Sequence, residues 1–363
     1  MMSFSLPKED LWQRMAADPR PKVIYGMGDG GDKLISRLEA KGIPYADVFA
    51  SDGFVRGQCF HGKKVLSFKE VEERYGDFIV LVSFATRLPE VIENIAQIAA
   101  RHPLFVPDMP VYGEAYFDLP FCESHIAEIK EAAELWADER SKEVYLSGIL
   151  GKLTGELSPL LSSADSFRAG FSLLPLDSFE TTVDAGAYRG DTATELLTLA
   201  PNVKKIIAIE PDDHSFVRLV RYAEEEHRAQ IIPYKGAAWS DSAVLSFLGK
   251  GNRGSHAKMK GEVRTVSGIP IDELCADETI DYIKFDVEGA EAQALAGAKN
   301  TILRDRPAIL LSLYHKAEDL FALPLQLKAL CPDYDFYLRR EFCLPLWEVN
   351  LLAVPKEKNR LKV

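Results

Sequence analysis

Residues 181–192 are Thr-Thr-Val-Asp-Ala-Gly-Ala-Tyr-Arg-Gly-Asp-Thr, and this stretch decides the fold of the chain. A short segment with the residues of a β-strand ends at Asp184. Small residues follow it, and a helical pattern begins near Asp191. The pattern predicts a strand, a tight turn and a helix. Gly186 and Gly190 would let a ligand approach the backbone closely, and the free N–H groups of the helix favour an anion. Asp184 suits an ammonium group, so the methionine end of S-adenosylmethionine, with its carboxylate and amine, would satisfy both features.

A second apolar segment supports the same ligand. Residues 205–209 (Lys-Ile-Ile-Ala-Ile) predict a buried strand that ends at Glu210-Pro211. Glu210 lies about 20 positions past Gly190, where an acid at the tip of a second strand can bind ribose hydroxyls. The glycine pattern is Asp-x-Gly-x-x-x-Gly and not Gly-x-Gly-x-x-Gly, which favours S-adenosylmethionine over a dinucleotide. The alternative is a glycine turn with an unrelated surface glutamate.

Composition narrows the class of protein. The 363 residues are 47% hydrophobic and 27% charged, and the net charge is −12. A chain of this length can hold two domains with full cores, and its acidity argues against nucleic acid as the main partner. We expect no signal peptide, no membrane span and a cytoplasmic location. The cysteines are scattered and odd in number, which favours free thiols over disulfides or zinc ligands. They are Cys59, Cys122, Cys275, Cys331 and Cys343.

A second glycine loop lies near the N-terminus, after a predicted helix at residues 8–17. Gly26, Gly28 and Gly31 match Gly-x-Gly-x-x-Gly after a short strand, and Asp52 follows about 20 residues later, as in dinucleotide-binding domains. The predicted strands at 47–50 and 78–83 complete only half of the usual fold. Nucleotide binding therefore stays open beside a structural or specificity role.

The predicted organisation has four parts. Residues 1–20 hold the N-terminal helix, 21–112 a small Rossmann-like α/β domain, 113–165 a helical connector, and 166–363 the main domain. In the main domain strands and helices alternate, which predicts a doubly wound, mostly parallel sheet. Two late strands, at 335–338 and 349–354, suggest an antiparallel closing hairpin, as methyltransferase sheets have. The cation-rich stretch 245–264 is either a hairpin over the site or a solvated loop.

The strand ends of the main domain should converge on one crevice. Asp184, Glu210, Asp286 and His315 all follow predicted strands. Transfer of a methyl group to an alcohol needs a base for the alcohol's proton, and Asp286, Glu288 or His315 could provide it. Taken singly, each is more simply a capping acid or a core histidine. The acids Asp286, Glu288 and Glu291 lack a recognisable metal spacing, so no metal ligands are predicted.

Several of these stretches resemble the FkbM family of S-adenosylmethionine-dependent methyltransferases. The matching segments are residues 183–192, Glu210-Pro211, and above all Lys284-Phe-Asp-Val-Glu-Gly-Ala-Glu291 with Leu295 and Gly297-Ala298. Residues 314–320 resemble a family variant whose late strand ends in Arg-His, where this chain has Arg339-Arg340. The resemblance covers residues 181–354.

This resemblance implies a class I methyltransferase fold and methylation of a hydroxyl on a sugar, glycan or secondary metabolite. It implies that Asp184, Gly186 and Gly190 line the methionine end of the cofactor, that Glu210 holds the ribose, and that Asp286 and Glu288 lie near the methyl group. The residues expected to contact the cofactor are Asp184, Gly186, Ala187, Tyr188, Gly190, Asp191, Thr192, Glu210, Pro211 and Ala237. His315 completes the expected catalytic set.

Two other functions remain open at this point. A nucleotide-sugar oxidoreductase or epimerase would use the Gly26–Gly31 loop, but no Tyr-x-x-x-Lys pair accompanies that loop. A non-catalytic protein that binds S-adenosylmethionine would keep the fold. The sequence names neither the acceptor molecule nor the oligomeric state, and a homo-oligomer is compatible with it.

Overall fold

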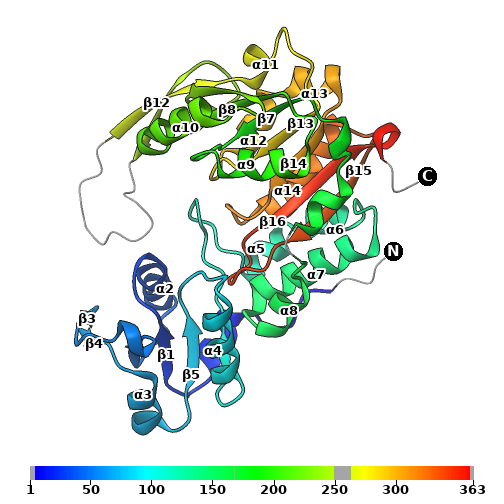
Figure 1. The fold of residues 1–363 in the computed structure, drawn as a ribbon. Helices are drawn as coiled ribbons and strands as arrows, with labels where there is room; N and C mark the ends of the chain where they lie inside the picture. The colour runs from blue at the N-terminus through cyan, green and yellow to red at the C-terminus, as the bar shows by residue number, and fades with distance from the viewer. Residues whose placement is uncertain (1–4, 167, 249–262, 360–363) are drawn as a thin grey trace.

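The computed structural model describes residues 5–166, 168–248 and 263–359 (Figure 1). Its N-terminal part begins with α1 (Leu11–Ala17), whose start Asp10 caps through a side-chain hydrogen bond. A four-stranded parallel sheet of order β2-β1-β5-β6 follows. Its strands are β1 (Lys22–Tyr25), β2 (Asp47–Phe49), β5 (Ile79–Val82) and β6 (Leu104–Phe105). The flanking helices are α2 (Asp29–Ala40), α3 (Phe68–Tyr75) and α4 (Pro89–Ala99), and β3 (Cys59–Phe60) pairs with β4 (Lys63–Lys64) in a separate hairpin.

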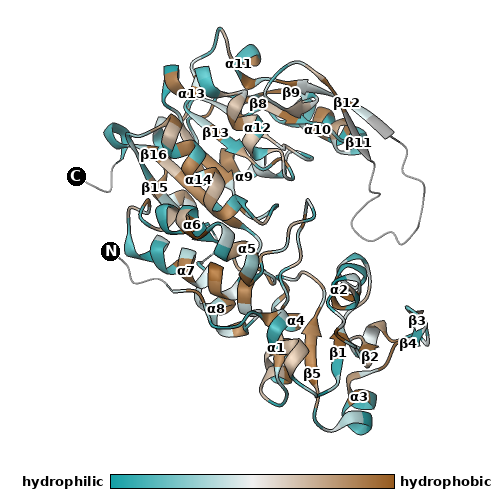
Figure 2. Ribbon diagram, turned by 180° about the vertical axis from the view of Figure 1, so that it is seen from behind, coloured by the Kyte–Doolittle hydropathy of each residue, from teal (hydrophilic) through white to brown (hydrophobic). Residues whose placement is uncertain are grey.

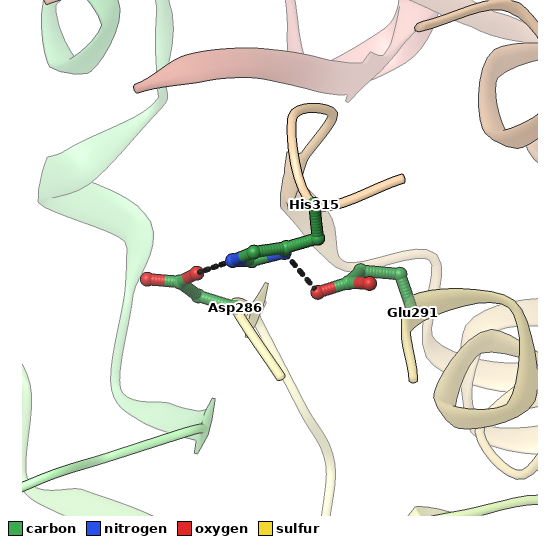
Figure 3. Close-up of side chains that lie close together, drawn as sticks. All are labelled: Asp286, Glu291 and His315. Atoms are coloured by element: carbon green, nitrogen blue, oxygen red, sulfur yellow. Dashed lines mark hydrogen bonds and ion pairs between the residues drawn. The ribbon is translucent and has the colours of Figure 1, made fainter. Parts of the chain in front are cut away.

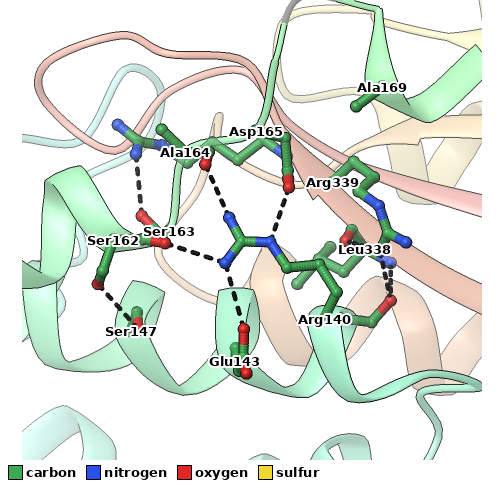
Figure 4. A network of polar contacts seen from close by, with 12 residues as sticks. Arg140, Glu143, Ser147, Ser162, Ser163, Ala164, Asp165, Ala169, Leu338 and Arg339 are labelled. Atoms are coloured by element: carbon green, nitrogen blue, oxygen red, sulfur yellow. Dashed lines mark hydrogen bonds and ion pairs between the residues drawn. The ribbon is translucent and has the colours of Figure 1, made fainter.

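The segment expected to be helical divides into short helices. They are α5 (Leu119–Ser124), α6 (Ile126–Ala133), α7 (Glu139–Thr154) and α8 (Leu157–Ser162). Asp138 caps the start of α7, and Gly155 ends it in the left-handed conformation. Figure 4 shows how this segment is tied to the main sheet. Arg140 of α7 donates to Asp165 (2.7 Å), and the same carboxylate accepts the backbone N–H of Arg340 (2.9 Å).

The C-terminal part is built on a seven-stranded sheet of order β15-β16-β14-β13-β7-β8-β9. The parallel strands are β7 (Thr181–Ala185), β8 (Lys205–Glu210), β9 (Gln230–Lys235), β13 (Tyr282–Phe285) and β14 (Ala308–Ser312). β16 (Val349–Pro355) runs antiparallel to both β14 and β15 (Tyr334–Arg340). The predicted fold class, with its antiparallel closing pair, is confirmed.

Helices cover both faces of this sheet (Figure 1). They are α9 (Asp191–Leu199), α10 (Asp213–Glu225), α12 (Glu291–Ala296), α13 (Lys299–Asp305) and α14 (Asp319–Leu330), with α11 (Ile271–Leu274) near β12. α14 and β5 are largely hydrophobic along their length (Figure 2). One hydrophobic cluster includes Val80 of β5, Ile149 of α7 and Leu311 of β14, so a continuous core runs through the parts that the sequence analysis divides. The four-part division itself stays a prediction.

A small sheet of order β10-β12-β11 adjoins the main one. β11 (Val244–Leu248) and β12 (Val263–Ile269) are antiparallel, and β12 pairs in parallel with β10 (Ala237–Ala238). The cations of the predicted basic hairpin from Lys250 to Lys260 lie outside the described residues. Within those residues, no helix is both long and apolar enough to cross a membrane.

Some element boundaries differ from the sequence predictions. α1 begins at Leu11 and not at Lys8, because Asp10 is its cap. β14 ends at Ser312, and Tyr314 and His315 follow it closely, as expected for His315. Asp52, which follows β2, lies in a short 3₁₀ helix (Asp52–Phe54).

Candidate active site

The turn between β7 and α9 brings two strand ends into direct backbone contact. Gly186 has φ +86°, and a Cβ placed on it would lie 1.9 Å from the carbonyl oxygen of Asp286. Gly190 has φ +91°, and a Cβ there would lie 2.3 Å from the ring of Tyr222. Only glycine fits both the conformation and the space at these positions. The close approach that the sequence suggested for a ligand is therefore also required by neighbouring protein atoms.

Asp184 is buried and already paired. Its carboxylate accepts the hydroxyl of Thr192 (2.5 Å) and lies 3.2 Å from Nζ of Lys284. Lys284 stands opposite Asp184 in the register of β13 against β7, and its Nζ also donates to the carbonyl of Gly186 (3.2 Å). Burial lowers the pKa of Lys284, but Asp184 and Asp286 outweigh burial and raise it. Lys284 is not among the predicted site residues, although a lysine inside an apolar strand demands a nearby carboxylate.

Glu210 ends β8 and holds the turn after β7. Its two carboxylate oxygens accept the backbone N–H groups of Tyr188 and Asp212, both at 2.8 Å. Burial raises the pKa of Glu210 to about 7. Tyr188 has φ +49°, a rare conformation for a residue other than glycine, and its ring is half exposed. Ala237 is buried in β10. A groove of about 480 Å³ lies beside these residues, lined among others by Tyr188, Arg189, Asp212 and Arg218.

Two of the predicted catalytic residues, Asp286 and His315, lie together in Figure 3, and the third, Glu288, lies close to the same imidazole. Nε2 of His315 lies 3.6 Å from a carboxylate oxygen of Asp286 and 3.7 Å from one of Glu288. The hydroxyl of Tyr314 donates to Asp286 (3.3 Å), and Nζ of Lys284 lies 3.6 Å from the same carboxylate. His315 is 1% exposed, whereas Glu288 is largely exposed. Lys284 thus links this cluster to Asp184.

Glu291 completes this cluster and was missed as a site residue. Its carboxylate oxygen Oε1 accepts Nδ1–H of His315 (2.8 Å) and the backbone N–H of Val287 (3.0 Å). The second contact closes the turn in which Glu288 has φ +53° and Gly289 has φ +96°. Backbone strain of this kind persists where the surrounding structure fixes it, as at functional sites. Glu291 therefore orients both the imidazole and the turn that presents Glu288.

The charges in the cluster follow from these contacts. Burial lowers the pKa of His315, but the hydrogen bond to Glu291 and the nearby carboxylates raise it to about 9. Burial opposes ionisation of Asp286, yet Lys284 and His315 hold its pKa below the usual value. One donor atom each of Asp286, Glu291 and His315 lies within 4.8 Å of the others, a mixed oxygen and nitrogen set that divalent cations use. The sequence predicts no metal ligands and leaves a metal requirement open, and it stays open here.

The N-terminal glycine loop has a packing explanation. A Cβ on Gly30 would lie 2.0 Å from the carbonyl oxygen of Ser83, and one on Gly26 would lie 2.5 Å from the ring of Phe84. α2 begins at this loop, and its first turn carries Asp29 and Asp32, which oppose a phosphate at the helix start. These contacts favour a structural role for this loop over nucleotide binding, the two roles that the sequence leaves open.

Comparison with known proteins supports the assignment of the C-terminal part. Residues 184–339 match the family model of the methyltransferase FkbM domain. The structure of methyltransferase FkbM from Methylobacillus flagellatus superposes with a TM-score of 0.70 at 23% identity, over 93% of this chain and 90% of that chain. The two chains therefore share their fold, the N-terminal part included.

Weaker likenesses cover half of this chain. Fibrillarin from Aeropyrum pernix, solved with bound S-adenosyl-L-methionine, has a TM-score of 0.33 at 14% identity, over 50% of this chain and 69% of that one. A caffeoyl-CoA O-methyltransferase homologue from Staphylococcus aureus has a TM-score of 0.32 at 10% identity, over 50% and 78%. Among curated proteins, none matches the sequence.

The matched residues contain the ion pair of Asp184 with Lys284 and the cluster around Asp286. They also include most of the closing strand β15. Residues 184–339 match the methyltransferase FkbM domain in sequence, and the chain shares the fold of the Methylobacillus flagellatus protein.

Proposed function

We propose that this chain transfers a methyl group from S-adenosylmethionine to a hydroxyl group of a sugar, glycan or secondary metabolite. The observation that carries the proposal is the arrangement along one edge of the main sheet. Glu210 lies at the end of β8, and the cluster of Asp286, Glu288 and His315 lies past β13 and β14. A cofactor site and a group of proton acceptors on one sheet edge are what alcohol methylation requires.

The residues of the β7–α9 turn fit the cofactor. We propose that the N–H groups at the start of α9 and the turn glycines receive the methionine carboxylate, and that Glu210 binds the ribose hydroxyls. The two backbone N–H groups that hold Glu210 leave each of its oxygens a second lone pair for such contacts. In this proposal, Asp184, Gly186, Ala187, Tyr188, Gly190, Asp191, Thr192, Pro211 and Ala237 complete the cofactor site.

Asp286 is the proposed base. When bound, the sulfonium cofactor supplies an electrophilic methyl group, and the acceptor hydroxyl must lose its proton as it attacks. Lys284 and His315 keep Asp286 ionised, so its carboxylate is ready to accept a hydrogen bond from the hydroxyl and then its proton. His315, oriented by Glu291, provides positive charge beside that carboxylate. Glu288, on the exposed side, would bind a further hydroxyl of the acceptor.

Calorimetry with separate ligands tests the cofactor assignment. We expect the full chain to bind S-adenosylmethionine and S-adenosylhomocysteine at one site, and to bind neither NAD nor a nucleotide sugar in the Gly26–Gly31 loop. NAD binding without S-adenosylmethionine binding would support the oxidoreductase alternative instead. Binding of S-adenosylmethionine without turnover on any hydroxyl acceptor would support the non-catalytic alternative. A cytoplasmic location is part of the proposal, and the five free cysteines, four of them buried, suit a reducing compartment.

A further inference from the structure

A loop from the N-terminal part reaches the candidate active site. Residues 106–118 join β6 to α5, and in Figure 1 this teal segment rises toward the main sheet. The backbone N–H of Tyr112 donates to the carbonyl oxygen of His315 (2.8 Å). Its side chain covers Gly289, since a Cβ built on that glycine would lie 2.8 Å from the tyrosine ring. Tyr112 therefore stands beside the turn that presents Glu288.

Several contacts fix this loop in place. Val106 N–H donates to the carbonyl of Gly155 (2.7 Å), and Asp108 forms a buried ion pair with Lys152 (2.9 Å). Lys33 of α2 donates to the carbonyl of Pro110 (3.1 Å). At the far end, Asp118 caps α5 and pairs with Arg37 (2.7 Å). A loop held at both ends and in the middle presents its side chains without a large entropic cost on binding.

The tyrosine ring remains open to solvent despite these anchors. Tyr112 is 48% exposed, although its backbone and one side of its ring are engaged. One cation lies near the ring: Nζ of Lys316 is 5.6 Å from the ring centroid. Beyond it, the carboxylates of Asp286, Glu288 and Glu291 surround the positively charged His315, and Asp184 pairs with Lys284, so acids outnumber cations in the cluster. An anionic acceptor would be repelled there, whereas hydroxyl groups can donate to these carboxylates.

We propose that the acceptor is a neutral sugar ring, that its apolar face stacks on Tyr112, and that its hydroxyl groups face Glu288 and Asp286. An exposed aromatic ring next to hydrogen-bond acceptors matches both surfaces of a pyranose, which has an apolar face and a polar edge. The N-terminal part thereby supplies a specificity residue to the methyltransferase domain. This inference rests on the proposed function, because it assumes that a hydroxyl is methylated at the Asp286 cluster.

Saturation-transfer NMR on the full chain with saturating S-adenosylhomocysteine tests the inference. The probes are methyl glycosides of glucose, galactose and mannose, together with methyl glucuronide, which matches the glucoside but carries a carboxylate. We expect at least one neutral glycoside to bind and the glucuronide to bind more weakly. Tyr112→Ala should weaken binding about three- to tenfold, the range for one aromatic contact. Tyr112→Phe should restore it, and Phe54→Ala, which removes an exposed ring from the 3₁₀ helix after β2, should have no effect.

The outcomes separate this inference from the proposed function. If calorimetry shows no binding of S-adenosylhomocysteine, the proposed function itself fails. If the cofactor product binds but no neutral glycoside does, or if the glucuronide binds best, the neutral-sugar inference is wrong while cofactor binding stands. Glycoside binding that Tyr112→Ala leaves unchanged would place the acceptor away from this loop and overturn the role of Tyr112.

Discussion

Glu210 illustrates how one side chain can couple the cofactor site to its turn. Its oxygens accept backbone N–H groups from Tyr188 and Asp212, which lie on two different connections of the sheet. We predict that Glu210→Ala weakens binding of S-adenosylmethionine about ten- to hundredfold, since hydrogen bonds to a charged group are worth about 1.5–3 kcal/mol. Isothermal calorimetry measures this directly. An unchanged dissociation constant in a folded variant would remove Glu210 from the cofactor site.

The raised pKa of Glu210 predicts a pH dependence of binding. Burial raises this pKa to about 7, so the carboxylate is ionised above that pH and protonated below it. The ionised form accepts hydroxyl hydrogen bonds through both oxygens, so affinity for S-adenosylmethionine should fall as the pH drops through about 7. In Glu210→Gln, the affinity for S-adenosylmethionine should no longer fall as this side chain titrates. Any pH dependence that remains should come from titration of the ligand itself. Equal pH profiles for both proteins would contradict the assignment.

Asp286 carries the prediction about chemistry. Asp286→Asn preserves the size of the side chain, and Asp184 still neutralises Lys284 in that variant. We expect cofactor affinity to stay within a few-fold of wild type, while turnover falls by about 10²–10⁴, the range for loss of a general base. Single-turnover kinetics with S-adenosylmethionine would measure the chemical step. Near-normal rates would move the role of base to His315 or Glu288.

At the level of elements, sequence patterns located the strand ends but not their partners. The spacing from Gly190 placed Glu210 at the tip of β8, where the structure has it. Lys284, Glu291 and Tyr112 were missed as site residues, because the contact that defines the role of each joins residues far apart in the sequence. Lys284 and Asp184 are 100 residues apart and meet only through the register of β13 against β7. Tyr112 reaches His315 from outside the segment that resembles the family.

The two glycine loops differ in what their glycines contact, and this difference is testable. Gly28 begins α2 with φ +110°, so Gly28→Ala should destabilise the protein by about 1–2 kcal/mol through backbone strain. Because this loop packs against β5 and its neighbours and lies outside the proposed cofactor site, affinity for S-adenosylmethionine should not change. Gly186→Ala is the comparison variant, with a Cβ that would clash with the Asp286 carbonyl. Loss of cofactor binding in a folded Gly28→Ala protein would overturn the assignment.

Across the whole molecule, the N-terminal part and the methyltransferase domain share a hydrophobic core and several buried polar links. Arg140, Asp165 and Arg340 join α7 to β15, and Thr86 pairs with Leu344 of the loop before β16. The loop that carries Tyr112 runs between these parts, and one of the contacts that anchor it is the buried ion pair between Asp108 and Lys152. The acceptor site should therefore respond to changes far from the reacting atoms.

The ion pair between Asp108 and Lys152 can be used to test whether a distant change affects the acceptor site. Both side chains are less than 10% exposed, and Nζ lies 2.9 Å from each carboxylate oxygen. Lys152→Met would leave a buried carboxylate without its partner, which costs about 3–5 kcal/mol, whereas removing both charges in Lys152→Met/Asp108→Asn costs less. The matched control is Lys204→Met at the exposed pair with Glu180, where the loss should be below about 1 kcal/mol.

Chemical denaturation would give these free energies of unfolding, and NMR with a neutral methyl glycoside would follow the acceptor site in the same variants. Because Asp108 anchors the loop of Tyr112, Lys152→Met should weaken glycoside binding. Calorimetry should show unchanged affinity for S-adenosylmethionine, whose proposed contacts lie at the ends of β7 and β8, at the start of α9 and on β10. The double variant should recover part of both losses, since it leaves no unpaired buried charge. If the single and double variants weaken glycoside binding equally, the ion pair does not hold the loop. If the single variant weakens binding of both the glycoside and S-adenosylmethionine, it disturbs the whole fold.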